Sequence, residues 1–251
     1  MKIIVVLSLF SSCFLTPDIQ AKEIKEVHWA LTAWKEATQK DGKGLFHEIV
    51  DQVFALQNIK LKKTYAPWKR SLSLVEDGLA DMTGGHTQTE KYYQAKLPIL
   101  VVKRAVFFKN KKLGKWQGLK SLSGKKGVWS TGFLEGLKKK EVQEALKNNG
   151  IGIVPKEAAM KMVIAGRADY FLDNMKRLKI LQTQMKGSVK DINDYQIETL
   201  YENPLYMSFS KNPRGKAISA IYDEGIRKLK ESGKLKTIYQ KWKREYPIEG
   251  S

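Results

Sequence analysis

The sequence contains very little cysteine and histidine. One of its 251 residues is cysteine, Cys13, and three are histidine, so no disulfide bond can form within the chain. No group of residues has the spacing of metal ligands. The motifs of nucleophile-elbow serine hydrolases and of helical zinc proteases are also missing. These absences predict a protein that is not an enzyme and that carries no metal and no cofactor.

Long apolar segments are missing beyond the N-terminus. Lys2 is followed by a mostly apolar run over residues 3–15, and Ala21 then offers a small residue. This order is typical of a secretory signal peptide, and the run is too short to span a bilayer comfortably. We expect residues 1–21 to be removed by cleavage near Ala21, which leaves a periplasmic protein. Lipid attachment at Cys13 is an alternative, although the residues before it fit the lipidation motif poorly.

Acidic residues are scarce relative to basic ones. Lysine and arginine number 45 against 26 aspartates and glutamates, and the formal net charge is +19. Such an excess is found in proteins that bind nucleic acid, anionic membranes or acidic ligands. The lysines are spread along the whole chain, and no nucleic-acid-binding motif accompanies them. We interpret the charge as a solvated, lysine-rich surface and expect no nucleic-acid partner.

The apolar residues indicate alternating strands and helices. Residues 27–33 have the composition of a strand, residues 45–57 repeat apolar side chains at helical spacing, and residues 59–65 form a second short strand. Pro67 opens another helix. The apolar face of that helix comprises Leu72, Val75 and Leu79. This alternation predicts an α/β fold.

One sequence unit occurs twice. Residues 74–82 read LVEDGLADM and residues 162–170 read MVIAGRADY. In each copy an apolar helix end meets a glycine, which suits a left-handed C-cap, and Ala-Asp then leads into an apolar strand. The two copies indicate two lobes of like design, although so short a match also arises by chance.

The second lobe begins near Leu119. A turn at residues 123–126, a strand over residues 127–129 and a helix over residues 133–147 follow. Residues 216–242 are expected to be helical, with Gly233 dividing the segment into two helices. The buried face of this helix pair comprises Ile218, Ile221, Ile226, Leu229, Leu235 and Ile238.

These features together resemble the extracellular solute-binding proteins of family 3, the polar-amino-acid-type receptors of bacterial ABC importers. Residues 44–50 (GLFHEIV) resemble the family's first helix, and residues 67–72 (PWKRSL) resemble a motif of one branch. The Gly-x-Ala-Asp units and the closing helix pair complete the match, which covers essentially the whole mature chain.

The resemblance implies the two-lobed fold of type II periplasmic binding proteins. Two crossover segments, near residues 107–109 and 206–210, would join the lobes, with the ligand in the cleft between them. Lobe 1 would comprise residues 22–108 plus 209–251, and lobe 2 would comprise residues 109–208. The implied protein is a monomer that delivers a small-molecule solute to the membrane subunits of an ABC permease.

Several loops of lobe 1 would contact the ligand in a protein of this family. Trp34 and Trp68 would form flat apolar walls, and Arg70 would reach a carboxylate with two hydrogen bonds. The ordinary alternatives are core packing for Trp34 and an exposed helix surface for Arg70. Small side chains and backbone N–H groups would approach the ligand closely at Gly84, Gly85 and His86.

Lobe 2 would contribute polar groups. Ser130 and Thr131 stand just before a predicted helix, where N–H groups favour an anion, and ordinary helix capping is compatible with that role. Asp173 would present a lone carboxylate to an amino group. Its neighbour Asn174 leaves the register open, and a surface aspartate is the simpler alternative.

The main departure from the family lies after Thr89-Glu90. Amino-acid-binding members have an arginine there, whereas this chain has Lys91 followed by Tyr92. Lysine cannot make the planar two-pronged contact of arginine with a carboxylate, which argues against a standard amino-acid ligand. We therefore expect a receptor for a small polar solute that is anionic or amino-acid-like. A dehydratase-like cleft enzyme and a sensory protein for a membrane kinase are the alternatives.

Overall fold

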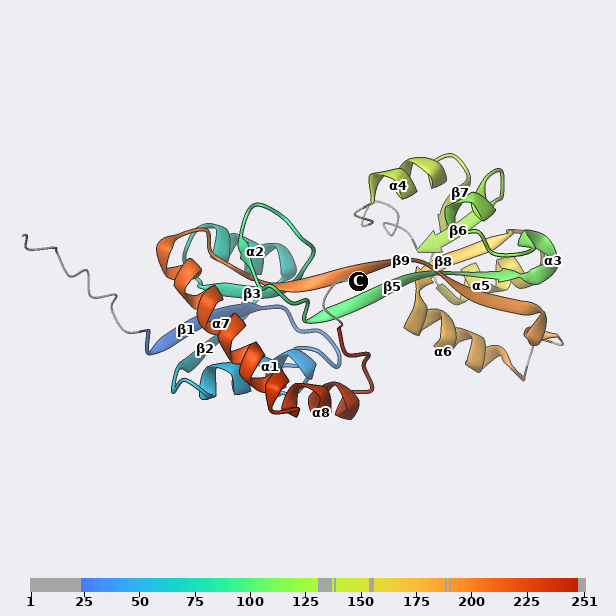
Figure 1. Cartoon of the computed structure of the whole chain (residues 1–251). Coiled ribbons are helices and arrows are strands. Elements are labelled where there is room, and N and C mark those ends of the chain that lie inside the picture. Colours follow the sequence, from blue (N-terminus) through green and yellow to red (C-terminus); the bar gives the residue numbers. More distant parts are fainter. Residues whose placement is uncertain are drawn as a thin grey trace, which may run out of the picture.

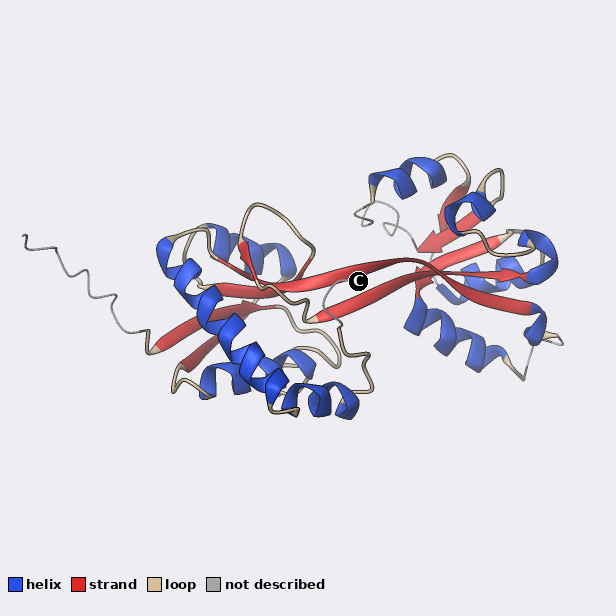
Figure 2. Ribbon diagram, viewed as in Figure 1, coloured by secondary structure: helices blue, strands red, loops and turns tan. Residues whose placement is uncertain are grey.

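The structure is a computed structural model, and it describes residues 24–130, 137, 139–153, 156–187, 189 and 191–247. Two groups of strands and helices are joined by two long strands, which gives the molecule an extended, two-lobed shape (Figure 1). Helices cover the sheet in both lobes (Figure 2). In the described part of the chain, no helix has the length and apolar character needed to cross a bilayer.

Lobe 1 is built on three parallel strands, β1 (Glu26–Leu31), β2 (Lys60–Tyr65) and β3 (Met82–His86). Helix α1 (Leu45–Ala55) and the C-terminal helices α7 (Pro213–Glu231) and α8 (Lys234–Lys241) share the main hydrophobic core with one face of this sheet. Helix α2 (Trp68–Glu76) covers the other face through a smaller cluster around Ala30 and Val75. The short strand β4 (Tyr93–Gln94) completes the lobe.

Lobe 2 repeats this plan with parallel strands β6 (Gly127–Ser130), β7 (Gly150–Ile153) and β8 (Tyr170–Asn174). Helices α5 (Lys156–Ile164) and α6 (Met175–Met185) pack on one face. The other face is covered by α4 (Lys140–Leu146), by the 3-10 helix Gly118–Leu122 and by Leu113 of α3 (Asn110–Leu113). A second 3-10 helix spans Ile192–Asp194.

Strands β5 (Leu100–Lys109) and β9 (Tyr195–Phe209) run antiparallel to each other through both lobes. They join the two sheets into one, with the order β2-β1-β3-β9-β5-β8-β6-β7. The register is shifted at two places, between Gly84 and His86 opposite β9 and between Arg104 and Ala105 of β5. Such bulges bend strands, and here they flank the stretch that lies between the lobes.

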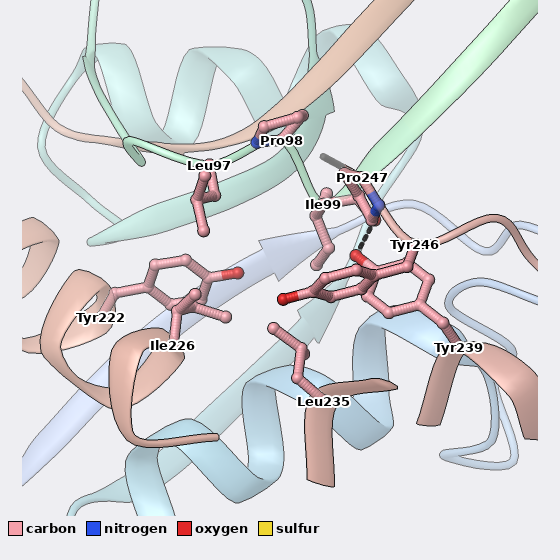
Figure 3. A pocket seen from close by; sticks show the side chains of 9 residues that line it. All are labelled: Leu97, Pro98, Ile99, Tyr222, Ile226, Leu235, Tyr239, Tyr246 and Pro247. Atoms are coloured by element: carbon pink, nitrogen blue, oxygen red, sulfur yellow. Dashed lines mark hydrogen bonds between the residues drawn. The ribbon is translucent and has the colours of Figure 1, made fainter. Parts of the chain in front are cut away.

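The C-terminal segment closes the core of lobe 1. The Tyr239 hydroxyl donates a hydrogen bond of 2.8 Å to the Ile99 carbonyl, and the rings of Tyr239 and Tyr246 meet edge to face at 5.3 Å (Figure 3). A cavity of only about 10 Å³ remains among these side chains. The helix pair therefore anchors the tail beside the start of β5.

The predicted α/β fold is confirmed, and so is the repeat. Gly78 and Gly166 both have a left-handed backbone, with φ of 70° and 73°. In lobe 1, the Asp81 carboxylate accepts a hydrogen bond from the His28 N–H, and the Asp81 N–H donates to the His28 carbonyl. Asp169 makes the same two bonds with Lys126 in lobe 2. Gly233, at φ 74°, divides the C-terminal helices as predicted.

Two predicted helices are shorter than expected. Helix α2 ends at Glu76, because Gly78 turns the chain, and Leu79 is 61% exposed instead of lying on the helix's apolar face. In the predicted helix 133–147, α4 begins only at Lys140, and Leu137 and Lys139 are not helical. Residues 133–136 and 138 of that prediction lie outside the described residues.

The first crossover lies earlier than residues 107–109. Phe107 and Phe108 pair with β8 and are fully buried in the two cores of lobe 2. The stretch of β5 between the lobes is instead residues 100–103, opposite residues 202–205 of β9. The second crossover therefore also lies earlier than residues 206–210, since Met207 and Phe209 pair with β3 and are buried in the core of lobe 1. These contacts favour a boundary between the lobes on β5 that lies before residue 108, the predicted end of the first part of lobe 1.

Candidate ligand-binding site

The carboxyl ends of the parallel strands in the two lobes face each other. Strand β3 is antiparallel to β9 and ends with His86 opposite Tyr206, whereas β8 is antiparallel to β5 and ends with Asn174 opposite Arg104. Arg104 is in turn opposite Tyr201 of β9. Five residue steps of β9 thus separate the two edges, roughly 17 Å at about 3.4 Å per residue. Ligands of α/β sheets bind outside the carboxyl ends of strands, so a ligand here would lie between the lobes.

Three aromatic rings form a row on the lobe 1 edge. Trp34 follows β1, Trp68 begins α2 after β2, and His86 ends β3. The ring centroids of Trp34 and Trp68 lie 5.2 Å apart, and Trp68 stacks on His86 at 5.8 Å with an interplanar angle of 22°. All three side chains are half-buried. The structure therefore brings together three of the predicted site residues as one aromatic wall.

The two glycines of β3 have partners within the protein. A Cβ on Gly85, whose φ is +81°, would lie 2.2 Å from the Trp34 ring, and a Cβ on Gly84 would lie 2.4 Å from the Met207 sulfur. Their small size was predicted to admit a ligand. In this structure the space beside Gly85 is filled by the Trp34 ring, and the space beside Gly84 is filled by the Met207 side chain.

Lys91 and Tyr92 both turn toward Glu76 of α2. The Tyr92 hydroxyl donates a hydrogen bond of 2.7 Å to the Glu76 carboxylate, and the Lys91 Nζ lies 3.4 Å from the same oxygen. The Tyr92 hydrogen bond and Lys91 hold the pKa of Glu76 below its ordinary value, while burial and Glu76 raise the pKa of Tyr92. The Tyr92 ring meets His86 edge to face at 5.5 Å. Tyr92 thus belongs to the aromatic wall, whereas Lys91 is exposed and ion-paired.

Arg70 lies in the first turn of α2 and is exposed. Among the described residues it has no acidic partner. This exposure agrees with the simpler alternative of an arginine on a helix surface, and the carboxylate-binding role stays a prediction.

On the lobe 2 edge, the prediction of a lone carboxylate is wrong. Asp173 is 0% exposed, and its side chain lies 3.4 Å from Arg177, one helical turn further along the chain. It also accepts a 2.7 Å hydrogen bond from the Asn174 N–H. Because side chains alternate along a strand, the next residue, Asn174, points the other way, and its amide oxygen accepts a hydrogen bond from Arg104. Ser130 ends β6, and its side chain, like all of Thr131, lies outside the described residues.

A cavity of about 1000 Å³ lies in the gap between the lobes. Lobe 1 contributes the loop after β1 and the segment after α8, lobe 2 contributes α6 and Asn174, and the floor is the interlobe part of β5. Seven lysines or arginines line it against three glutamates. The basic residues are Lys35, Lys103, Lys176, Arg177, Lys179, Lys243 and Arg244.

Glu36 connects three parts of the molecule at this cavity. Its carboxylate pairs with Lys176 of α6 in lobe 2 and lies 3.0 Å from Arg244 after α8. The Lys176 hydrogen bond and the neighbouring cations lower the pKa of Glu36. The next tail residue, Glu245, pairs with Lys103 of β5 at 2.7 Å. The tail is thus fixed to the interlobe strand and to the loop that carries Trp34.

Glu36, Arg104 and the basic residues of α6 are not among the site residues predicted from the sequence. Their partners are distant in sequence, and no motif marks them. The pairing of Arg104 with Asn174 spans 70 residues, and that of Lys176 with Glu36 spans 140. For Glu36 and α6, only their positions just after β1 and β8 could have indicated a role, because those strand ends face the cleft. Arg104 lies within β5 and has no such signal.

Comparisons with known proteins agree on the fold. No family model and no curated sequence matches the chain. A histidine kinase sensor domain with similarity to periplasmic binding proteins is similar in structure, with a TM-score of 0.59 and 15% identity over 87% of this chain and 96% of that one. The GluR0 ligand-binding core of Nostoc punctiforme, in complex with L-glutamate, has a TM-score of 0.58 and 16% identity over 86% and 98%.

A third similar structure is an amino acid ABC transporter substrate-binding protein of Streptococcus pneumoniae bound to L-arginine. Its TM-score is 0.54 and its identity 18%, over 87% of this chain and 94% of that one. At such identities the likeness concerns the fold, and it extends over nearly the whole of each compared chain. The chain therefore has the two-lobed α/β fold of the periplasmic binding proteins.

Proposed function

We propose that this protein is a periplasmic receptor that captures a small polar, anionic or amino-acid-like solute by hinge closure and delivers it to an ABC importer. The observation that carries the proposal is the opposition of two carboxyl strand edges across an interlobe gap. One edge carries the wall of Trp34, Trp68 and His86, and the other carries Asn174 held by Arg104.

Closure is needed because the gap is wide. A separation of roughly 17 Å along the strands exceeds the length of a small metabolite, so a ligand can contact both edges only after they approach. Strands β5 and β9 are the only described segments of the chain that cross between the lobes, which also meet at the ion pair of Glu36 with Lys176. The bulges on either side of the interlobe stretch are natural places for bending. A ligand that contacts both edges favours the closed form by its differential affinity.

The ligand's chemistry follows from the groups at the gap. The aromatic wall at the lobe 1 edge offers flat apolar contact. The interlobe cavity, whose lining does not include these rings, has a surplus of basic residues that favours negative charge. Lys91 is engaged by Glu76, and Asp173 is engaged by Arg177. A modified amino acid or a small organic acid fits these groups better than a standard amino acid gripped by both its carboxylate and its amine.

The test is a thermal-shift screen of amino acids and organic acids, followed by small-angle scattering of the protein with each hit. We expect a binding ligand to raise the melting temperature and to reduce the radius of gyration. Trp68→Ala should weaken binding through lost stacking area. A ligand consumed in excess over the protein would indicate an enzyme, and a hit that leaves the radius of gyration unchanged would contradict hinge closure.

A second candidate function is ligand sensing for a membrane kinase. The structural likeness to a histidine kinase sensor domain supports it. The genes next to this one separate the candidates: permease and ATPase genes support delivery to an importer, and a kinase gene supports sensing.

A further inference from the structure

The interlobe cavity has an apolar floor. Three residues of β5, Leu100, Val101 and Val102, line it together with Ile180 and Leu181 of α6. Ile180 is 48% exposed, whereas Leu181 beside it is buried in the lobe 2 core. A large aliphatic side chain exposed inside a concave site is a typical feature of ligand pockets.

The rim of the same cavity is basic. Lys35 comes from the loop after β1, Lys179 from α6 and Lys243 from the segment after α8. In the part of the chain that the structure describes, none of these three lysines forms a close ion pair, although the charge of Lys35 helps to lower the pKa of the neighbouring Glu36. Cations from three separate elements repel one another when they gather around one cavity, and an anion relieves that repulsion.

We propose that this cavity binds an amphipathic organic anion, a carboxylate carried on an aliphatic or aromatic body larger than a polar amino acid. The proposal rests on the receptor function above and names its ligand class. It places the ligand's body on β5 and α6 and not on the aromatic wall, whose rings do not line this cavity. The body would cover Ile180 and the valines of β5, and the carboxylate would lie among the rim lysines. The volume, about 1000 Å³, is at the upper end of the range for small-molecule pockets, about 300–1,000 Å³.

A substitution at Glu36 is expected to strengthen ligand binding, whereas most substitutions in a binding site weaken it. Its carboxylate neutralises Lys176 and Arg244, both of which line the cavity. Removing that charge makes two further cations available to the ligand. A substitution that only damages the site would weaken binding, whereas Glu36→Gln is expected to strengthen the binding of an anion.

The experiment is calorimetric titration of the mature protein with 3-phenylpropionate, its neutral amide, acetate and glutamate. We expect 3-phenylpropionate to bind more tightly than the other three. Lys179→Ala should weaken its binding about twofold to fivefold, the range for one partly exposed charge, and Glu36→Gln should strengthen it by a similar factor. Lys236→Ala makes the same charge change on α8, away from the cavity, and should leave the affinity unchanged.

The apolar contact is tested separately with Ile180→Thr. This change should weaken 3-phenylpropionate binding and leave stability nearly unchanged, because the side chain is already half exposed. Equal affinity in the Lys179, Glu36 and Ile180 variants would overturn the proposal. Binding of glutamate without binding of 3-phenylpropionate would overturn the ligand class and leave the receptor function standing. If no compound in this set or in the wider screen binds, the receptor function fails as well.

Discussion

The Trp34 ring occupies the space that a side chain on Gly85 would need. A Cβ at Gly85 would lie 2.2 Å from that ring, and the backbone there has φ +81°. Gly42 has nearly the same φ, +80°, with no atom within 4 Å of a Cβ. Substitutions at Gly42 and Gly85 can therefore be compared to distinguish the cost of backbone strain from the cost of a steric clash.

We predict that Gly85→Ala destabilises the protein more than Gly42→Ala does. Gly42→Ala should cost about 1 kcal/mol, from the left-handed backbone alone. Gly85→Ala should cost a further 1–3 kcal/mol or so, because Trp34 must move. Urea unfolding measures both values. Equal losses in the two variants would show that Trp34 moves aside without cost.

A second prediction concerns the buried Asp173. Arg177 is its only ion-pair partner among the described residues, and the carboxylate is fully buried. Arg177→Met should lower the free energy of unfolding by about 1–3 kcal/mol, because an unpaired buried charge is costly but Arg177 itself is partly exposed. Arg167→Met, at an exposed arginine of the same lobe, is the control and should change stability by less than about 0.5 kcal/mol.

A third prediction compares the two repeat aspartates. Each accepts a hydrogen bond from a strand N–H, His28 for Asp81 and Lys126 for Asp169. Asp81 also pairs with Arg214 of α7, whose Nε lies 2.7 Å away, whereas Asp169 has only a longer contact of 3.8 Å with Lys112. Asp81→Ala should therefore cost about 2–4 kcal/mol and Asp169→Ala about 1–2 kcal/mol, as measured by chemical denaturation. Equal losses in the two variants would show that the Arg214 pair contributes no more than the longer Lys112 contact.

A fourth prediction uses the pKa of Glu76. The pKa of Glu76 lies below its ordinary value of 4.5, and the largest cause of this lowering is the hydrogen bond from Tyr92. Tyr92→Phe should therefore raise the pKa of Glu76, as followed by NMR titration of its carboxyl carbon. Tyr93→Phe, one residue on, should leave it unchanged.

The same hydrogen bond makes stability depend on pH. Because the folded-state pKa of Glu76 is lowered, its stabilising contribution is fully present above pH 4.5 or so and is lost as the pH falls through the lowered value. Tyr92→Phe should reduce the stability lost over that acidic range. An unchanged acid dependence in this variant would contradict the assigned role of Tyr92.

Much of the fold could be predicted because its signals are local. The helical spacing around Phe46 and Val50 became α1, and Gly78, Gly166 and Gly233 turned the chain where expected. The helical spacing after Pro67 was extended too far: Leu79 was predicted on the apolar face of α2, but it lies beyond Gly78, where the chain turns, and is exposed. The site was predicted less completely. Trp34, Trp68 and His86 do meet, but Lys91 and Asp173, which were expected to contact the ligand, form ion pairs with Glu76 and Arg177.

The sequence by itself determined two α/β lobes, their internal repeat and the strand ends at which a site would form, because these depend on periodicity, glycine and residue order. Only the tertiary structure decided which side chains face the gap. Tyr92 rather than Lys91 joins the aromatic wall, and Asn174 rather than Asp173 meets Arg104. A shift of one residue along a strand turns a side chain to the opposite face, and the charges that pair across the cavity come from segments up to 208 residues apart. Such choices depend on packing between distant parts of the chain, which no local pattern encodes.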